Sequence, residues 1–385
     1  MIPRFKPQYD MTDWLAALKL TRGNIPKYEH EFASKFGCDY GVMFPHGRTG
    51  IYALLKVWGL KDAEIICPAY TCVVVPNAIV LSGNIPVFVD CEDGEFNMSL
   101  SGILEAITEK TRVIIPTHLF GYPMNVIEIQ KIVENAETKY GHKIYVIQDC
   151  AHSYGATWQG QLVTKFGDAA IFGSNVSKII NSIFGGMVIT NNEDLYNKLE
   201  DWKNNNLIDR KWKKSLSRFL YFFAINVAFN KIIYNAVNWL ERRGYLNRFV
   251  KYYDESTIDM PKDWNHAPSE IEARVGRNQL RKYDEIIQTR RANAKNIIKM
   301  MQERKDIWMM PFVHGATYSH VVGIVDDRDR WVDKYYKNGI QLGILIEYSI
   351  PEMKAYSNFK KNCPTAKKYS NKTINFPVWE SIRLN

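Results

Sequence analysis

Three groups of residues in this sequence could together bind a phosphorylated cofactor. Asp149 ends the apolar run Ile144-Tyr-Val-Ile-Gln-Asp149, and Lys178 follows a second run that ends near Phe172. The turn Pro45-His-Gly-Arg-Thr-Gly50 is rich in small residues and opens a helical pattern, whose first N–H groups suit a phosphate. A phosphate cradle, a buried carboxylate and a lysine are the parts that a pyridoxal phosphate site requires.

The elements that would position these residues are short apolar runs that alternate with segments long enough for helices. Continuous runs such as Val113-Ile-Ile115 are typical of strands that are covered on both faces. The sequence predicts seven strands, at Tyr40–Phe44, Glu64–Pro68, Ile85–Asp90, Arg112–Thr117, Lys143–Asp149, Ala169–Ser174 and Gly186–Thr190. We therefore expect an α/β domain with a mostly parallel sheet, whose strand ends gather the functional loops.

Helical periodicity separates and follows these strands. It covers Thr49–Trp58, Met124–Tyr140 and Glu193–Asn205, and a long helical pattern runs from Ser269 to about Glu303. The remainder, including Thr317–Val325 and Gly339–Tyr348, is typical of a smaller α+β unit. We expect a large domain at 1–202, an inserted segment at 203–263 and a small C-terminal domain at 264–385.

The charge of the chain is concentrated in one stretch. Lys plus Arg number 50 and Asp plus Glu number 41, which gives +9, and residues 203–251 hold 11 basic and 2 acidic residues. The rest of the chain therefore balances, 39 against 39. A protein that grips nucleic acid over its whole face would carry basic residues throughout, so we expect no nucleic-acid partner.

The N-terminus and the cysteines bear on location and metal binding. Met1-Ile-Pro-Arg-Phe-Lys-Pro7 has no apolar stretch followed by a cleavage site, so we expect a cytoplasmic protein. The 6 cysteines are too sparse for a disulfide scaffold and have no CxxC spacing. We expect reduced, mostly buried thiols and no metal site.

Taken in order, the motifs resemble the sugar aminotransferase family typified by DegT and StrS, within the fold-type I pyridoxal phosphate enzymes. The resemblance covers nearly the whole chain and rests on an ordered set of motifs: Gly47-Arg-Thr-Gly-Ile-Tyr-Ala-Leu54, Pro68-Ala-Tyr-Thr-Cys72, Pro86-Val-Phe-Val-Asp90, Pro116-Thr-His-Leu-Phe-Gly-Tyr-Pro123, Asp149-Cys-Ala-His-Ser-Tyr-Gly-Ala156, Lys178 and Gly185-Gly-Met-Val-Ile-Thr190. It implies the fold-type I aminotransferase fold, a large domain with a mostly parallel seven-stranded sheet plus a smaller C-terminal α+β domain.

The resemblance also implies roles for individual residues. Lys178 would hold the cofactor covalently and then carry a proton, and Asp149 would pair with the pyridinium nitrogen. His152 stands where the family has glutamine; it would bind the ring hydroxyl and could add pH sensitivity. The remaining residues expected around the cofactor are Gly47, Arg48, Thr49, Cys72, Ser174, Ser177 and Asn265.

The resemblance implies a further role for Asn265 and adds two positions, His118 and Tyr348. Asn265 falls where the family supplies a phosphate ligand from the neighbouring subunit, which implies a homodimer with shared active sites. His118 and Tyr348 fall at positions near the substrate in relatives, and a purely structural role is an equal alternative for His118.

The sequence departs from the family pattern at several of these positions. Cys72 replaces an aromatic residue that stacks on the cofactor ring, and Gly173 replaces a serine, which leaves the hydroxyl assignment open between Ser174 and Ser177. The stretch Glu347-Tyr-Ser-Ile-Pro351 lacks a histidine. We therefore expect an unusual acceptor sugar.

Most of residues 203–263 is an insertion relative to the family. Phe219–Leu240 contains one charged residue, Lys231, and its asparagines and apolar residues fall on opposite halves of a helix. Basic clusters at Arg210–Arg218 and Arg242–Lys251 flank this amphipathic pattern. Two interpretations remain open: residues 210–251 bind an anionic membrane surface, or they form a helical hairpin that packs on the body of the enzyme or across its dimer.

The resemblance implies a pyridoxal phosphate-dependent aminotransferase that converts a keto-sugar to an amino sugar. The sugar would be a nucleotide-linked deoxysugar destined for surface polysaccharide, and an amino acid such as glutamate would be the donor. The enzyme would be cytoplasmic or peripheral on the inner face of the membrane. The alternatives are a sugar dehydratase with the same cofactor, whose relatives have histidine at the position of Lys178, and a non-catalytic cofactor-binding regulator or membrane scaffold.

Overall fold

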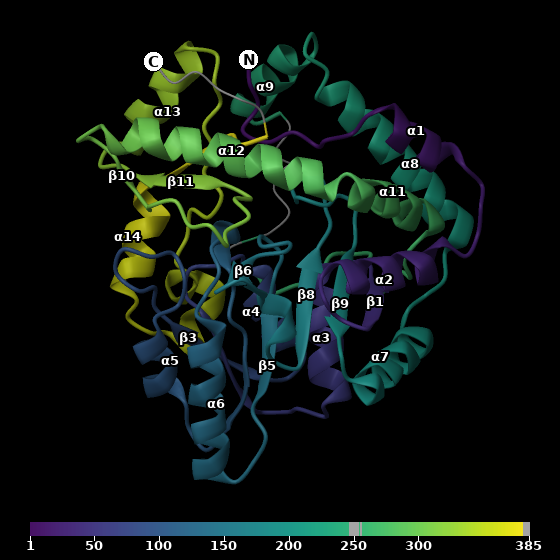
Figure 1. The fold of residues 1–385 in the computed structure, drawn as a ribbon, viewed down its shortest axis with the longest axis vertical. Coiled ribbons are helices and arrows are strands. Elements are labelled where there is room, and N and C mark those ends of the chain that lie inside the picture. Colours follow the sequence, from purple (N-terminus) through teal and green to yellow (C-terminus); the bar gives the residue numbers. More distant parts are fainter. Residues whose placement is uncertain (246–253, 255, 380–385) are drawn as a thin grey trace.

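A seven-stranded sheet forms the centre of the computed structural model, which describes residues 1–245, 254 and 256–379 (Figure 1). The strands lie in the order β1 (Tyr40–Phe44), β9 (Gly186–Thr190), β8 (Ala169–Gly173), β5 (Tyr145–Asp149), β4 (Thr111–Ile114), β2 (Glu64–Pro68) and β3 (Ile85–Val89). β9 runs opposite to the other six strands, which are parallel to one another. The predicted strands are confirmed, with bounds that shift by one to three residues at some ends.

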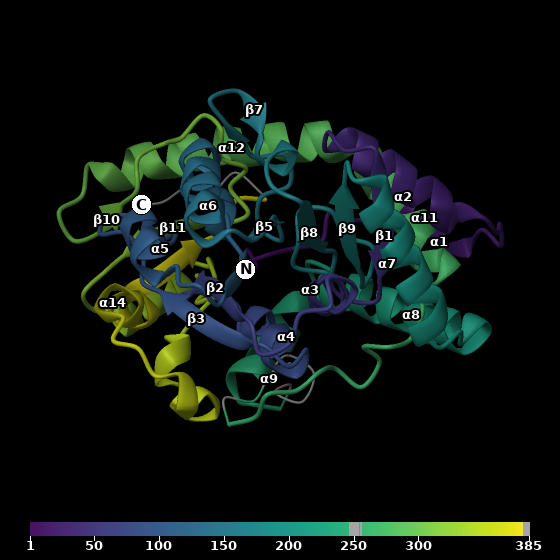
Figure 2. The same cartoon turned by 90° about the horizontal axis from the view of Figure 1, so that it is seen from below.

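Helices cover both faces of this sheet, as Figure 2 shows from below. Alternate side chains of a strand point to opposite faces, so Val42 and Phe44 contact the core on one side of β1 and Met43 contacts the core on the other. The first face is covered by α3 (Gly47–Val57), α4 (Val74–Leu81) and α7 (Glu193–Asn206). The second is covered by α2 (Asn24–Lys35), α5 (Leu100–Ala106) and α6 (Val126–Tyr140).

The small domain is built around an antiparallel sheet of β10 (Trp308–Met309), β11 (Val321–Ile324) and β12 (Thr373–Phe376). Its helices are α13 (Arg328–Lys337) and α14 (Pro364–Lys372), and the predicted long helix is two helices, α11 (Glu270–Arg281) and α12 (Tyr283–Gln302). The N-terminal segment also lies here, because Ile2 N donates to Gly339 O at 2.7 Å. The first residues of the predicted large domain therefore pack against the small domain.

Several short elements complete the described part of the chain. β6 (Thr157–Trp158) and β7 (Gln161–Leu162) form a two-stranded ribbon. Four 3₁₀ turns lie at Leu119–Gly121, Val163–Lys165, Ile350–Glu352 and Lys354–Phe359. No helix among the described residues is long and apolar enough to cross a membrane. Five of the six thiols are buried as expected, and Cys72 is half-buried.

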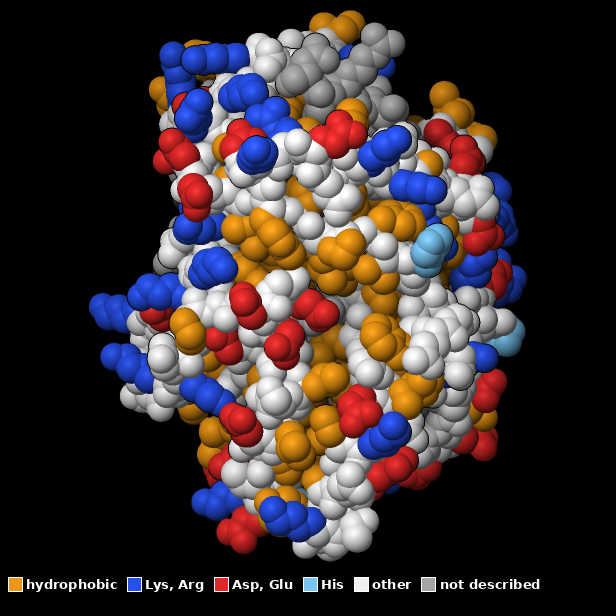
Figure 3. Space-filling view, turned by 60° about the vertical axis from the view of Figure 1, so that its left-hand side comes forward, with side chains coloured by type: hydrophobic (Ala, Val, Ile, Leu, Met, Phe, Trp, Pro, Cys, Tyr) orange, Lys and Arg blue, Asp and Glu red, His pale blue; other side chains and the backbone are white. Residues whose placement is uncertain are grey.

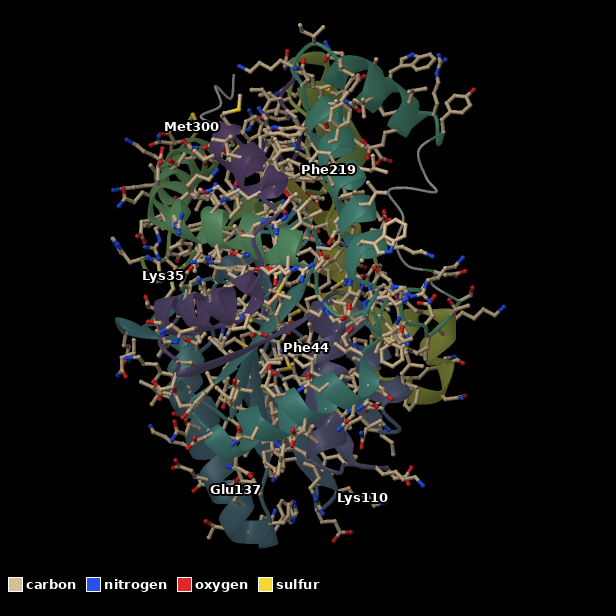
Figure 4. The ribbon with its side chains drawn as sticks, turned by 90° about the vertical axis from the view of Figure 1, so that its right-hand side faces the viewer. Lys35, Phe44, Lys110, Glu137, Phe219 and Met300 are labelled. Carbon is tan, nitrogen blue, oxygen red and sulfur yellow. The ribbon has the colours of Figure 1, made fainter. Side chains whose placement is uncertain are left out.

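The predicted insertion, residues 203–263, contains two helices, α8 (Lys211–Ala228) and α9 (Tyr234–Arg242), as the helical-hairpin interpretation expects. Figure 4 shows α8 along the side of the molecule, with Phe219 on it. Phe222 is buried against Trp14 of α1 (Met11–Leu18), with ring centroids 4.7 Å apart. On α9, the hydroxyl of Tyr234 donates to Gln341 Oε1 at 2.5 Å. One side of the insertion therefore packs on the body of its own chain.

Two cations of the first basic cluster, Lys214 and Arg218, lie inside the protein, as expected for a segment that packs on its own chain. Lys214 Nζ donates to the carbonyl oxygens of His266 and Ala267 at 2.9 and 2.8 Å. Arg218 Nε donates to Glu272 Oε1 at 2.7 Å. A helical pattern gives the face of a cation but not the carboxylate of a distant helix that pairs with it. Arg248 and Lys251, at the end of the second basic cluster, lie outside the described residues.

Figure 3 shows one face of the molecule, on which acidic and basic side chains are interspersed.

Candidate active site

Asp149 is the last residue of β5 and is 3% exposed. Its Oδ1 accepts from Ala151 N at 3.0 Å and its Oδ2 accepts from the hydroxyl of Thr117 at 3.1 Å. Burial raises the pKa of Asp149, while the Ala151 amide, the Lys178 charge and the Thr117 hydroxyl lower it. A protonated ring nitrogen placed beside this carboxylate would favour its charged form, so the site fits a pyridinium group.

Lys178 lies in the loop that follows β8, next to Asp149 in space. A Cβ atom on Gly173 would lie 3.7 Å from its Cε, so the backbone at Gly173 borders the lysine side chain. Burial lowers the pKa of Lys178, and Cys72 and Asp149 oppose this effect. A lowered pKa increases the fraction of neutral amine, the form that attacks a carbonyl carbon.

His152 also faces this site, and a backbone contact fixes the position of its proton. Its Nδ1 accepts from Phe120 N at 3.3 Å, which assigns the ring hydrogen to Nε2. Burial, followed by the charges of Lys178 and His320, lowers the pKa of His152 well below its usual value. The imidazole therefore stays neutral at ordinary pH, and the pH sensitivity expected of this residue does not follow.

Phe120 holds its amide toward His152 in an unusual backbone conformation. Its φ is 57°, a region that bulky residues rarely adopt and that costs about 1–3 kcal/mol. Such strain persists where the surroundings enforce it, and Phe120 is fully buried. The loop after Thr117 thus serves both Asp149 and His152.

The predicted phosphate turn forms the start of α3, with His46 as its N-cap. Thr49 N and Gly50 N donate to His46 O, so the amides of Gly47 and Arg48 precede the first complete helical turn. On β9, a Cβ atom at Gly186 would lie 2.3 Å from Gly47 N, which only glycine avoids. The tight approach shapes a cradle at the positive end of the helix.

The hydroxyl groups expected at the phosphate differ in their surroundings. Thr49 donates its hydroxyl to Trp264 O at 3.1 Å. Ser174 is buried, with its Oγ 3.4 Å from the hydroxyl of Tyr154, whereas the half-buried Ser177 donates to Asn175 Oδ1 at 2.7 Å. The assignment of the phosphate hydroxyl to Ser174 or Ser177 stays a prediction.

Asn265 follows Trp264 and so lies beside the phosphate turn of its own chain. Its carbonyl oxygen accepts from Ile208 N at 2.7 Å. Its contribution to a neighbouring subunit stays a prediction.

His118 and Tyr348 have different surroundings. His118 is fully buried; its Nε2 contacts Gln148 Oε1 at 3.0 Å and its Nδ1 accepts from Met124 N at 2.9 Å. Both ring nitrogens are thus occupied, which favours the structural alternative over substrate contact. The hydroxyl of Tyr348 accepts from Val73 N at 3.1 Å. This bond places Tyr348 beside Cys72, where the open face of the cofactor is expected.

Thr117 and His320 belong to the site, although the sequence motifs predict no role for either. Thr117 lies within a motif quoted above, and only the strand-end position could have indicated that it orients Asp149. His320 precedes β11, and its ring centroid is 5.7 Å from that of His152. Burial lowers the pKa of His320 to about 3, with further contributions from Arg290, Lys178 and Arg4. No sequence signal separates this histidine from an ordinary core residue.

A chain of charged groups joins the insertion to the phosphate turn. Asp263 accepts from His46 Nε2 at 2.8 Å and from Arg218 Nη2 at 2.6 Å. Burial opposes ionisation of Asp263, but these two contacts hold its pKa below the usual range. Arg218 thereby connects Asp263 to Glu272 on α11.

Comparison with known proteins agrees with this geometry. The sequence profile described as the DegT/DnrJ/EryC1/StrS aminotransferase family matches residues 8–385. A GDP-perosamine synthase of Escherichia coli O157:H7 is 26% identical over 376 residues, which cover 94% of this chain and 87% of that protein.

Solved structures share the fold at lower identity. A sugar aminotransferase from Micromonospora echinospora has a TM-score of 0.78 at 20% identity, with 98% of this chain and 95% of that chain covered. An E. coli GDP-4-keto-6-deoxy-D-mannose-3-dehydratase with bound hydrated PLP has a TM-score of 0.77 at 20% identity, with 98% and 95% covered. These likenesses establish the fold-type I architecture. With the profile match over nearly the whole length, they lead to one assignment: the chain belongs to the DegT/DnrJ/EryC1/StrS aminotransferase family.

Proposed function

We propose that this chain is a pyridoxal phosphate-dependent aminotransferase that converts the keto group of a nucleotide-linked sugar to an amine, with an amino acid such as glutamate as donor, for surface polysaccharide. The observation that carries the proposal is the meeting of Asp149, His152 and Lys178 in one buried site beside the phosphate turn. The name of the E. coli relative, a GDP-perosamine synthase, supports a nucleotide-linked substrate.

The residues of the site divide the work of transamination. When bound, pyridoxal phosphate supplies a ring that withdraws electrons from the carbon that loses or gains a proton. Asp149 keeps a proton on the ring nitrogen, and Thr117 and the Ala151 amide hold the carboxylate in place. His152 would offer its Nε2 hydrogen to the cofactor, since its Nδ1 accepts from Phe120 N. Lys178 would supply the amine that holds the cofactor and that accepts and returns a proton.

The proposal is tested by separating the two halves of the reaction. The cofactor-loaded enzyme should release 2-oxoglutarate from glutamate with loss of the absorbance band of the lysine-bound cofactor. A nucleotide-linked keto-sugar should then restore the band and appear as an amino sugar by mass. Absence of 2-oxoglutarate from an enzyme with bound cofactor would contradict the proposal.

The same experiment separates the alternatives. A dehydratase would yield a product lighter by water that retains no amine, and a regulator or scaffold would yield neither product. Lys178 argues against dehydration, because the relatives that catalyse it have histidine at this position.

The enzyme is proposed to be a homodimer in which Asn265 completes the partner's phosphate site. Mixing Lys178→Ala and Asn265→Ala chains should restore activity, because each mixed dimer then holds one site with both residues intact. Random exchange should give about a quarter of the wild-type rate. Activity no higher than that of the separate variants would show that Asn265 acts within its own chain.

The outer side of the insertion is proposed to contact an anionic membrane surface. Trp212, Leu216, Leu220, Phe223 and Val227 recur every three or four residues on α8 and are 38–68% exposed. This apolar stripe differs from the predicted apolar face, whose Phe222 is buried. On the adjoining α1, Met11, Leu15 and Leu18 are 56–71% exposed. A contiguous exposed patch of this kind marks an interaction site.

The charges near the apolar stripe favour a lipid surface over a second copy of the chain. Arg210 and Lys213 are exposed at the start of α8, and Lys19 and Arg22 are exposed after α1. Each cation near an anionic bilayer contributes about 1 kcal/mol of attraction, whereas two copies of this face would repel each other.

Co-sedimentation with vesicles tests the membrane contact. The wild type should sediment with phosphatidylglycerol-containing vesicles but not with pure phosphatidylcholine, and salt should release it. Leu220→Glu with Phe223→Glu should abolish binding, whereas Leu104→Glu, at a 60% exposed leucine of α5, should not. A variant that binds vesicles as before but loses self-association in sedimentation velocity would assign the stripe to a second copy.

A further inference from the structure

Residues 263–267 form a short segment that contacts both the insertion and the phosphate turn. On the side of the insertion, Lys214 Nζ donates to two backbone carbonyl oxygens of this segment, at 2.9 and 2.8 Å. The backbone of Ile208, just before α8, adds two hydrogen bonds: Ile208 N donates to Asn265 O at 2.7 Å, and Ala267 N donates to Ile208 O at 2.9 Å. The insertion therefore fixes the path of this segment.

The same segment contacts the phosphate turn at two points. Asp263 Oδ1 accepts from His46 Nε2 at 2.8 Å, and Trp264 O accepts from the hydroxyl of Thr49 at 3.1 Å. His46 is the N-cap of α3, but its side chain makes no capping bond to the helix, so Asp263 sets the position of its ring. The amides expected to donate to the phosphate lie between these two points of contact.

Arg218 joins these contacts to the body of the protein. Its Nη2 donates to Asp263 Oδ2 at 2.6 Å, and its Nε donates to Glu272 Oε1 at 2.7 Å. The planar guanidinium thus bridges two carboxylates, a geometry that the single ammonium of a lysine does not reproduce. The guanidinium carbon also lies 4.2 Å from the centroid of the Phe184 ring, which lies 6.3 Å from that of His46. Arg218 therefore contacts both the hydrogen-bond partner of His46 and the aromatic ring beside it.

The charges of this cluster are paired and withdrawn from water. Lys214, Arg218 and Glu272 are buried, and Lys214 Nζ lies 3.6 Å from Glu272 Oε2. Two cations thus face two carboxylates, Glu272 and Asp263. A buried ion pair adds little net stability, because desolvation offsets the attraction, and its best attested use is to fix one arrangement of the chain. The cluster is therefore suited to positioning the segment.

We propose that Arg218 and Asp263 are positioning residues that act through His46 and hold the phosphate turn in the arrangement that binds the cofactor phosphate. The inner side of the insertion then completes the cofactor site, whatever its outer side contacts. The inference rests on the proposed aminotransferase function, whose phosphorylated cofactor it assumes, and deepens it. Because both residues act through the turn, their loss should lower the affinity for the phosphate group and not that for the ring.

Titration of the full chain, stripped of cofactor, with pyridoxal phosphate and with pyridoxal tests the inference, because pyridoxal lacks the phosphate. Arg218→Gln should raise the dissociation constant for pyridoxal phosphate about tenfold, the equivalent of one lost hydrogen bond, and leave that for pyridoxal unchanged. Arg218→Lys keeps the charge and one carboxylate contact, so its affinity should be intermediate. The matched control is Lys213→Gln, at an exposed lysine of the same helix, which should bind both compounds like the wild type.

Asp263→Asn separates positioning from a simple effect of charge. Loss of a negative charge near the turn would by itself favour phosphate binding. An amide, however, has one acceptor oxygen and cannot accept from both His46 and Arg218. We expect binding of pyridoxal phosphate to weaken about tenfold here too, the equivalent of one lost hydrogen bond. This variant keeps the pair of Arg218 with Glu272, and thermal unfolding checks that its fold is intact.

Two results would overturn the inference. One is an unchanged or lower dissociation constant for pyridoxal phosphate in Arg218→Gln and Asp263→Asn. The other is an equal loss of affinity for pyridoxal phosphate and pyridoxal, which would assign the cluster a general structural role. The proposed function fails separately, if the wild type binds the cofactor but lacks the glutamate half-reaction. An intact half-reaction with unchanged phosphate affinity in both variants contradicts only the positioning role.

Discussion

Replacement of Lys178 by alanine should lower turnover at least about 1,000-fold and remove the absorbance band of the lysine-bound cofactor. The amine is the only group of the buried site that both bonds to the cofactor and can move a proton, and a positioned acid–base group contributes about 10²–10⁴-fold. Stopped-flow measurement of 2-oxoglutarate release, together with the absorption spectrum, checks both effects.

Two controls distinguish loss of the amine from loss of structure. Lys110→Ala removes an exposed lysine just before β4 (Figure 4), at the end of the sheet opposite to the strand ends near Lys178, and should behave as wild type. Added methylamine should restore part of the rate in the Lys178 variant, because a free amine can enter the space left by the side chain. An unchanged spectrum in Lys178→Ala would assign the cofactor bond to another residue.

The second large effect is expected at Asp149. Asp149→Ala should retain cofactor but turn over about 100–1,000-fold more slowly, a range typical of removing one electrostatic stabiliser. The isosteric Asp149→Asn should be similarly slow, since an amide cannot stabilise the proton on the ring nitrogen. Dialysis followed by the absorption spectrum measures cofactor retention, and single-turnover kinetics measures the rate.

Thr117→Val should reduce turnover less than the substitutions of Asp149 do. It removes one of the two hydrogen bonds that orient the Asp149 carboxylate and keeps the other, from Ala151. Its rate should lie between those of the wild type and Asp149→Asn. Wild-type turnover in Asp149→Asn would show that the carboxylate only supports the fold.

The large domain was predictable because its strands are unbroken apolar runs. A strand such as β5 must be apolar on both faces to lie between two helical layers, so Tyr145–Asp149 stands out without knowledge of its neighbours. The positions of Asp149 and Lys178 could be predicted for the same reason. Asp149 ends one strand, Lys178 follows another, and these strand ends lie at one edge of the sheet.

The insertion was less predictable because periodicity describes one helix and not its partners. The pattern across 219–240 does not register the turn that separates α8 from α9. Nor does it reveal that Lys214 and Arg218 meet carbonyl and carboxylate groups from residues 263–272. Long-range contacts likewise decide that His118 is occupied on both nitrogens and that Phe120 fixes the proton of His152.

Arg218 has a thermodynamic consequence for the helix that carries it. Its guanidinium lies on the inner side of α8 and reaches His46 at the phosphate turn through Asp263, while the apolar stripe lies on the outer side of the same helix. Any ligand of the outer side that displaces Arg218 would alter the affinity of the turn for phosphate. Since coupling between two binding equilibria is reciprocal, occupancy of the cofactor site would change the affinity of that outer ligand by the same factor.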